Sequence, residues 1–216
     1  MNSIPKIIKD ISVHTDYTTF YKFIHVKGIE LYGPNFILFE EDAPVIAKLL
    51  IYFLQDQKMC EFNNISLQKG IMLTGPVGCG KTTLLNLMRY LLPPDKRYFI
   101  KPCREIAINY SIEGYEVIQR YTKLSFNPYN KQPLTICFDD LGLETIVQFF
   151  GNECNTMSEI LLSRYDHFIQ KDMCTHLTSN LSANEIQERY GIRVRSRMRE
   201  MFNLISFDKD SIDKRK

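Results

Sequence analysis

The sequence predicts an α/β protein in which a parallel β-sheet is covered by helices on both faces, giving three layers. Three observations support this class. Short apolar runs suited to buried strands alternate with segments of helical periodicity. A glycine-rich turn joins one of these strands directly to a helix. The composition, 44% hydrophobic and 24% charged over 216 residues, is ordinary for a globular chain.

Composition also excludes several classes of protein. The net charge of +2 comes from 27 basic and 25 acidic residues, so the overall charge indicates no polyanionic partner. The six cysteines are scattered without a CxxC pair, which favours reduced thiols over disulfides or zinc. No apolar run approaches the roughly 20 residues of a membrane span, and the N-terminus lacks a signal-peptide core. We therefore expect a cytoplasmic protein that does not contact a membrane.

Three regions differ in character. Residues 1–42 are rich in Tyr, Phe and Ile, lack a long helical period and end in an acidic cluster, so we expect an N-terminal arm or small module of unknown role. Residues 43–207 carry the alternating pattern and form the predicted core. Residues 208–216 are almost all charged and are expected to fray.

The first half of the core predicts a helix, a strand, a turn and a second helix. Over 43–58 the apolar side chains recur at the i, i+1, i+4, i+5 spacing of one helical face. The apolar run 70–74 is too short for a helix and predicts a buried strand. After the turn, leucines keep helical spacing until Pro93 and Pro94 stop the helix.

The middle of the core predicts strand, helix and strand again. Residues 98–101 form a short strand candidate, and 134–138 are continuously apolar, as expected of a strand buried on both faces. Between them, 111–123 has helical spacing. The side chains expected to face inward from this helix are Ile112, Tyr115, Val117, Ile118 and Tyr121.

The last elements are marked by helix caps. Thr156 with Glu159, and Ser182 with Glu185, match the capping box that opens a helix. Gly191 is expected to end the second of these helices. The remaining expected elements are a strand at 174–179, a short arginine-rich helix at 194–202 and a last strand at 203–207.

The turn after the first strand carries the strongest functional signal. Residues 75–82, GPVGCGKT, satisfy GxxxxGK[ST] between a predicted strand and a helix, the context that makes this motif specific. Its glycines let backbone amides turn toward an anion at a helix N-terminus. Lys81 can reach the β- and γ-phosphates, and the Thr82 hydroxyl can bind Mg²⁺. The expected nucleotide-binding set, in which positions 79 and 83 are passengers, is Gly75, Pro76, Val77, Gly78, Cys79, Gly80, Lys81, Thr82 and Thr83.

Two adjacent acids follow the strand at 134–138. A phosphate-binding loop needs an acid at the end of another strand to hold the metal, and we assign that role to Asp139. Asp140 would polarise the attacking water as a general base. The alternative for Asp140 is a solvated strand-end acid that caps the next segment. The pair favours hydrolysis over binding alone, with ATP or ADP and Mg²⁺ as the expected ligands.

Further downstream, Asn180 ends the strand at 174–179, where its amide could touch the γ-phosphate and the attacking water. An Asn at such a place is more often a turn residue. Arginines then occupy every second position over 193–199. On a helix this spacing spreads them around the axis, so some must face a partner.

These segments together resemble the AAA+ superfamily, and within it the clade of DnaC-type helicase loaders and IstB-type transposition ATPases. The resemblance rests on GPVGCGKT, TICFDDLG (135–142), ILLSRYDHF (160–168), HLTSNLS (176–182) and YGIRVRSRMRE (190–200), and spans about residues 43–207. It implies that Asn180 senses the γ-phosphate and that Arg197 is an arginine finger completing the site of a neighbouring subunit. Arg193 resembles a further basic position of the same segment.

The resemblance also implies partners. A homo-oligomer would form through residues 193–199, and a replicative helicase or a transposase-like protein would be the target. Only nine residues follow Phe207, so the sequence has no room for the C-terminal helical lid of many AAA+ proteins. The absence of NKxD and LSGGQ-like stretches argues against a GTPase and a transporter ATPase.

Single-stranded DNA is a further candidate partner. Arg104, Arg120, Lys123 and Lys131 are interleaved with Tyr110, Tyr115, Tyr121 and Tyr129, the mixture of cations and stacking rings that such binding needs. The alternative is that the tyrosines pack and the cations are solvated. We therefore expect a Mg²⁺-dependent ATPase acting in DNA replication or mobile-element transactions. The alternatives are a nucleotide-gated adaptor with negligible hydrolysis and, less favoured, a small-molecule kinase.

Overall fold

The computed structural model describes residues 4–11 and 15–215, so parts of the predicted arm and the last residue of the predicted tail lie outside the described residues. The chain divides into two compact units. One contains the described residues up to Leu67 together with Pro76–Arg97 and those from Ile205 onward. The other contains Gln68–Gly75 and Tyr98–Leu204. The predicted boundary at residue 43 stays a prediction.

A five-stranded sheet organises the second unit, with strand order β2-β3-β6-β1-β7. The pairs β2–β3, β3–β6 and β6–β1 are parallel, which confirms the predicted α/β class. Carboxyl ends of parallel strands lie at one edge of a sheet, where ligands of such folds bind. The strands are β1 (Gly70–Thr74), β2 (Phe99–Pro102), β3 (Ile136–Leu141), β6 (Thr175–Ser179) and β7 (Phe202–Ser206).

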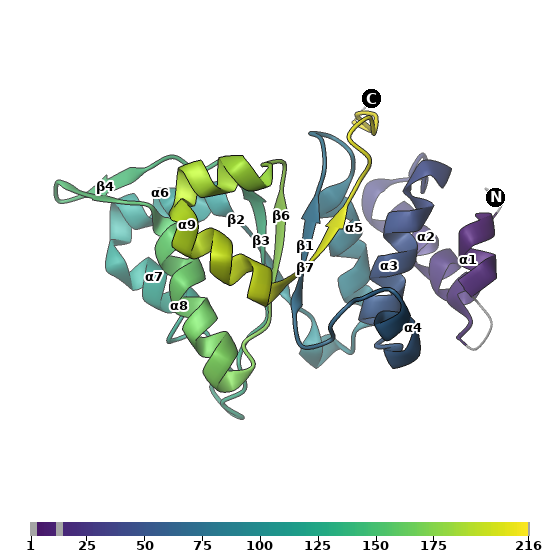
Figure 1. The fold of residues 1–216 in the computed structure, drawn as a ribbon, viewed down its shortest axis with the longest axis horizontal. Coiled ribbons are helices and arrows are strands. Elements are labelled where there is room, and N and C mark those ends of the chain that lie inside the picture. The colour runs from purple at the N-terminus through teal and green to yellow at the C-terminus, as the bar shows by residue number, and fades with distance from the viewer. Residues whose placement is uncertain (1–3, 12–14, 216) are drawn as a thin grey trace. The chain divides into compact units, whose positions relative to one another are not determined.

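Four helices pack with this sheet around one hydrophobic core (Figure 1). Phe138, Ile160, Leu177 and Val194 are all at most 2% exposed in that core. A small antiparallel hairpin, β4 (Val147–Phe149) with β5 (Asn152–Cys154), was not predicted. The helices are α6 (Cys103–Glu113), α7 (Tyr115–Tyr121), α8 (Thr156–Lys171) and α9 (Ala183–Met201).

The helix predicted at 111–123 is two helices. Helix α6 starts at Cys103, and Gly114, with φ of 64°, separates it from α7. The break turns Ile112 and Tyr115 outward, at 71% and 59% exposed, so their expected inward orientation is wrong. Val117, Ile118 and Tyr121 are buried as predicted.

Of the two capping boxes predicted for the later helices, one is present and one is not. Ser182 and Glu185 form the predicted capping box at the start of α9. The box predicted at Thr156 is wrong, because Asn155 caps α8 by accepting from the backbone of Ser158 at 3.1 Å. Gly191, with φ of 85° and ψ of 162°, interrupts α9 where the sequence predicted an end.

One charged side chain lies fully buried in this unit. Arg164 of α8 is 0% exposed and donates to five neutral acceptors over 2.7–3.3 Å. Burial lowers the pKa of its guanidinium to about 10. The acceptors are the hydroxyls of Thr175 and Ser125 and the carbonyls of Tyr121, Leu134 and Cys174. Arg164 therefore joins α8 to β6 and to the segments that precede β3 and β6.

The first unit is helical, and its longest helix contradicts the expected lack of helical period before residue 43. Helix α2 (Tyr17–Tyr32) begins at Asp16, which accepts from the backbone of Thr19 at 3.1 Å. Its buried positions recur at i, i+4, i+7 and i+11. The other helices are α1 (Lys6–Ile11), α3 (Ala43–Phe53), α4 (Gln57–Phe62), α5 (Lys81–Met88) and the 3-10 turns Glu40–Asp42, Arg89–Leu91 and Pro94–Lys96.

The helix predicted at 43–58 ends early. Gln55 adopts φ of 55°, and Asp56 starts α4 by accepting from the backbone of Met59 at 3.1 Å. The second carboxylate oxygen of Asp56 accepts from the hydroxyls of Thr15 at 2.8 Å and Tyr17 at 2.7 Å. Asp56 therefore starts α4 and anchors the beginning of α2.

The segment after β7 is ordered against this unit, and the expected fraying is wrong. Among the described residues, 207–215 contain no helix. Lys214 donates its backbone N–H to the carbonyl of Gly78 at 3.0 Å and its ammonium to Asp42. Across the described ranges, no helix is both long and apolar enough to cross a membrane.

Candidate functional site

The predicted phosphate loop follows β1 and leads into α5. Gly78 and Gly80 have φ of 81° and 100°, backbone conformations that favour glycine. Gly80 directly precedes α5, so the backbone of the loop ends at a helix N-terminus. Lys81, the first residue of α5, is 5% exposed, and its ammonium donates to the carbonyl of Pro76 at 2.8 Å. The loop therefore folds around its own lysine.

The other loop residues differ in burial. Thr82 and Thr83 are half-buried in the first turn of α5, and Val77 is 55% exposed. Cys79 is 0% exposed, and burial raises the pKa of its thiol. A buried, protonated thiol supplies no ligand, and the passenger role of Cys79 stays a prediction.

The acidic pair lies on an irregular stretch of β3. The register between β3 and β6 shifts between Phe138 and Leu141, and Asp140 adopts φ of 55°. Thr178 of β6 spans this bulge: its hydroxyl donates to Asp139 at 2.6 Å and accepts the backbone N–H of Asp140 at 2.7 Å. One hydroxyl therefore orients the Asp139 carboxyl group and fixes the backbone of Asp140, and Thr178 is a positioning residue that the sequence did not single out.

The residues expected around the γ-phosphate share one sheet edge. Thr74 pairs in register with Ser179, so the loop's first residue, Gly75, and Asn180 both follow paired strand residues. Asn180 is exposed, and the preceding Ser179 hydroxyl donates to the carbonyl of Leu141 at 2.7 Å. The second unit therefore brings Gly75, both acids and Asn180 to the carboxyl ends of neighbouring strands.

A buried carboxylate fixes the segment after the acids. Glu144 is 3% exposed, accepts the backbone N–H of Gly142 at 2.9 Å and accepts from the Tyr190 hydroxyl. Arg189 donates to the carbonyl of Glu144. The buried environment and the nearby carboxylate raise the pKa of Tyr190. The network formed by Glu144, Arg189 and Tyr190 ties the end of β3 to α9. In the sequence its only sign was the acid Glu144 within a largely apolar stretch.

The arginine-rich half of α9 carries a mixture of contacts. The Arg197 guanidinium is half-buried and lies 5.0 Å from the centre of the Tyr165 ring, and Tyr165 donates to Glu200 at 2.8 Å. Arg195 donates to Gln187 at 2.5 Å, while Arg193 is exposed. Arg197 thus rests on an aromatic side chain at the surface of its unit, and the arginine-finger role stays a prediction.

Half of the predicted stacking tyrosines are core residues. Tyr110 and Tyr121 are each 7% exposed, so their predicted role in stacking on bases is wrong. Tyr115 and Tyr129 are 59% and 94% exposed. Arg120 forms an ion pair with Glu113. Arg104, Lys123 and Lys131 are exposed.

The chemistry of the predicted metal ligands suits Mg²⁺. Thr82 and Asp139 offer a hydroxyl and a carboxylate oxygen, and Mg²⁺ is held by one or two such groups together with substrate phosphates. Within the described part of the chain no cluster of three His, Cys, Asp or Glu side chains could hold a metal by itself. All six cysteines are described, and no disulfide joins them.

Comparison with known proteins gives a consistent result for the fold. No protein-family model matches the sequence, and no curated protein sequence matches it. The solved structure of the DnaC helicase loader superposes with a TM-score of 0.53 at 14% identity, over 83% of this chain and 96% of that one.

Two other solved structures agree. A putative primosome component from Streptococcus pyogenes serotype M3 gives a TM-score of 0.56 at 19% identity, over 89% of this chain and 90% of that chain. A DNA replication initiation factor gives 0.51 at 18% identity, over 80% of this chain and 48% of the other. With the parallel sheet and the loop after β1, these likenesses show that the chain has the AAA+ P-loop fold, as found in the DnaC helicase loader.

Proposed function

We propose that this chain binds ATP with Mg²⁺ at the phosphate loop and hydrolyses it. The observation that carries the proposal is the loop itself. Left-handed glycines at 78 and 80 lead into α5 with a buried Lys81 at its first position. Backbone amides, a helix N-terminus and a lysine converge in this way on phosphate oxygens.

The acids of β3 supply the second part of the proposed reaction. Bound Mg²⁺ would neutralise charge on the β- and γ-phosphates. Thr82 and Asp139 would hold it, and Asp140 would take a proton from the attacking water. Asn180 would position that water against the γ-phosphate. The Thr178 hydroxyl supports this division of roles because it holds both the Asp139 carboxyl group and the backbone of Asp140.

Arg197 would act on the nucleotide of an adjoining copy. A cation supplied in trans offsets the charge that develops on the transferred phosphoryl group. The proposal is supported by the surface position of Arg197 on Tyr165 and by the exposure of Arg193 and Arg199 in the same segment. It requires a homo-oligomer that forms through residues 193–199.

We assign the cycle to DNA replication or mobile-element machinery, with a replicative helicase or a transposase-like protein as the target. Support comes from the fold shared with a helicase loader and a primosome component. Single-stranded DNA would contact the exposed cations around α6 and α7 together with Tyr115 and Tyr129.

Phosphate release from γ-labelled ATP tests the reaction. We expect Mg²⁺-dependent release of label as inorganic phosphate, faster with single-stranded DNA, and loss of at least tenfold in turnover for Asp140→Asn. If the chain bound ATP but released no phosphate above background, with or without DNA, it would be a nucleotide-gated adaptor. Transfer of label to a small molecule instead of water would make it a kinase.

A further inference from the structure

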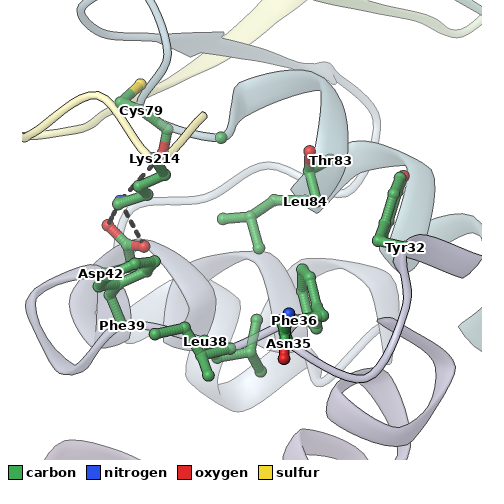
Figure 2. A pocket seen from close by; sticks show the side chains of 12 residues that line it. Tyr32, Asn35, Phe36, Leu38, Phe39, Asp42, Cys79, Thr83, Leu84 and Lys214 are labelled. Carbon is green, nitrogen blue, oxygen red and sulfur yellow. Dashed lines mark hydrogen bonds and ion pairs between the residues drawn. The ribbon is translucent and has the colours of Figure 1, made fainter. Parts of the chain in front are cut away.

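A pocket of about 370 Å³ opens beside the phosphate loop, within the first unit (Figure 2). One wall comes from the loop and the start of α5, where Cys79, Gly80, Thr83 and Leu84 line it. The opposite wall is the segment that connects α2 to α3. That segment contributes Tyr32, Asn35, Phe36, Ile37, Leu38, Phe39 and Asp42.

The lining suits the base of a nucleoside triphosphate. Rings and aliphatic side chains make up most of the lining, and the Asn35 amide and the Thr83 hydroxyl are among its polar groups. Sites for small ligands combine a mostly apolar surface with a few polar groups in this way. Because the pocket shares Cys79, Gly80 and Thr83 with the phosphate loop, a triphosphate on the loop would direct its base into it.

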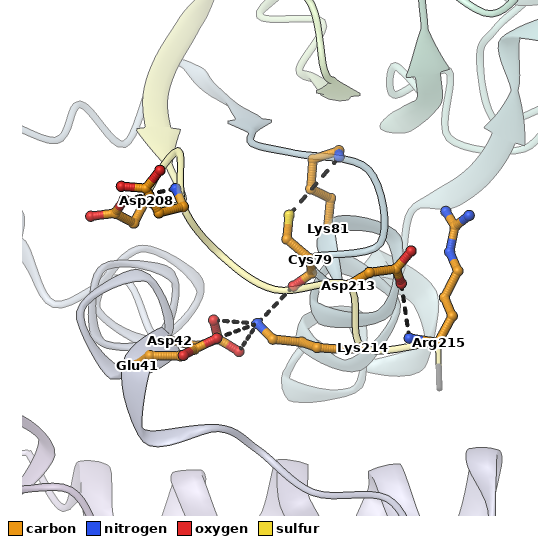
Figure 3. Close-up of polar contacts among 9 residues, drawn as sticks. Glu41, Asp42, Cys79, Lys81, Asp208, Asp213, Lys214 and Arg215 are labelled. Carbon is orange, nitrogen blue, oxygen red and sulfur yellow. Dashed lines mark hydrogen bonds and ion pairs between the residues drawn. The ribbon is translucent and has the colours of Figure 1, made fainter.

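The third wall of the pocket comes from the C-terminal segment, through Lys214. The Lys214 ammonium donates to both carboxylate oxygens of Asp42, at 2.5 and 2.6 Å, and to the carbonyl of Cys79 at 3.0 Å (Figure 3). The side chains of Lys214 and Asp42 are only 10% and 6% exposed. The Lys214 ammonium also lies 5.1 Å from the centre of the Phe39 ring. One cation thus joins the connecting segment to the phosphate loop.

The main chain of the same segment touches the loop directly. The backbone N–H of Lys214 donates to the carbonyl of Gly78 at 3.0 Å. A Cβ placed on Gly78 would lie 2.1 Å from a carboxylate oxygen of Asp213, so the Asp213 side chain lies directly against the backbone of the loop. Two successive residues therefore pack on the loop that would hold the phosphates.

We propose that residues 207–215 form a clasp that completes the base pocket, with Lys214 as the residue that positions its walls. The clasp rests on the proposed function, because the pocket takes a base only if the loop takes phosphates. Without the Lys214 ammonium, Asp42 and the α2–α3 connection lose their link to the loop, and the pocket widens. Nucleotide binding and docking of the clasp are then linked, so each strengthens the other.

Calorimetric titration with two ligands isolates the base from the phosphates. ATP carries a base, and inorganic tripolyphosphate carries the phosphates alone. We expect Lys214→Ala to weaken ATP binding about tenfold and to leave tripolyphosphate binding within about twofold. Lys214→Gln, which keeps a hydrogen-bond donor, should lose less. Lys209→Ala, an exposed lysine of the same segment, is the matched control and should bind both ligands as the unchanged protein does.

Limited tryptic cleavage provides an independent readout on the unchanged protein. By linkage, ATP should slow cleavage after Lys214 and Arg215, and tripolyphosphate should slow it less.

The outcomes separate the two proposals. If the unchanged protein binds neither ligand, the proposed function and the clasp both fail. If it binds ATP and Lys214→Ala binds equally well, the ATPase proposal stands and the clasp is refuted. Tighter ATP binding by Lys214→Ala would show that the segment obstructs the site, which also overturns the clasp.

Discussion

At the residue scale, the Thr178 hydroxyl controls the geometry of the acidic pair. Thr178→Val keeps the shape of the side chain and removes both hydrogen bonds, leaving the Asp140 N–H without that acceptor. We expect kcat to fall at least tenfold, with KM for ATP within about twofold, because Asp140 acts on the water and not on nucleotide affinity. Steady-state phosphate release measures both constants.

Thr178→Ser serves as the control, since it retains the hydroxyl. It should recover most of the turnover lost in Thr178→Val. If Thr178→Val instead raised KM for ATP and changed kcat little, Thr178 would act on nucleotide binding.

His176 gives the unit a specific response to pH. Its ring is 3% exposed, accepts the backbone N–H of Ile71 at 3.0 Å and lies edge-on to Tyr98. Burial, with a smaller contribution from Arg164, lowers the pKa of His176 to about 3. In the unfolded chain that pKa is about 6.5, so between these values the unfolded state binds more protons and stability falls as the pH falls.

The prediction for His176 is therefore a loss of stability on acidification. The free energy of unfolding should drop below about pH 6.5, by up to ~1.4 kcal/mol per pH unit from this residue. Urea unfolding at pH 7.5 and pH 5.5 measures the loss. His176→Asn offers an acceptor without titrating and should show a flatter pH dependence; an identical slope in both proteins would assign the effect elsewhere.

At the scale of elements, Arg164 links α8 to β6 and to the segment that precedes β3, the strand on which both acids lie. Arg164→Met fills much of the same volume and removes all five donated hydrogen bonds, so carbonyl and hydroxyl groups lose their partner in the core. We expect the free energy of unfolding to fall by at least ~3 kcal/mol. Denaturant unfolding checks this value. Arg104→Met, at an exposed position of α6, should change stability by no more than ~0.5 kcal/mol.

The sequence predicted the strands well and the helices less well. β1 and the first half of β3 are short apolar runs, as buried strands require, while β6 is mostly polar although it is buried; all three were predicted to within a few residues. The helix ends depend on single backbone conformations. The left-handed Gln55 and the glycine at 114 each divide a segment whose apolar periodicity continues across the break.

In the candidate site, too, some residues could be predicted from the sequence and others could not. The phosphate loop and the acidic pair could be found because their chemistry requires adjacent residues. Thr178, Glu144 and Lys214 contact residues 38 or more positions away, and no local pattern marks such contacts. The charged composition of 208–216 suggested fraying, because composition does not reveal the buried carboxylate of Asp42.

At the scale of the whole molecule, the arginine-finger proposal predicts complementation between two inactive proteins. Lys81→Ala removes the loop lysine and keeps Arg197, and Arg197→Ala does the reverse. Each alone should retain less than about a tenth of the turnover, with Arg197→Ala still binding ATP. Mixed in equal amounts, they should recover about a quarter of the turnover, because one interface in four pairs an intact loop with an intact arginine.

The mixing experiment also depends on assembly. The rate of phosphate release by the unchanged protein should rise more than linearly with protein concentration until all chains are in the oligomer. A mixture that stays as inactive as its components would place Arg197 outside the neighbouring site.

The most direct test of the central claim is calorimetric titration of ATP and Mg²⁺ into the unchanged protein and into Lys81→Ala. We predict saturable binding with one nucleotide per chain for the unchanged protein, and affinity reduced at least a hundredfold for Lys81→Ala, because the ammonium at the loop is lost. Equal affinities in the two proteins, or no binding in either, would contradict the account.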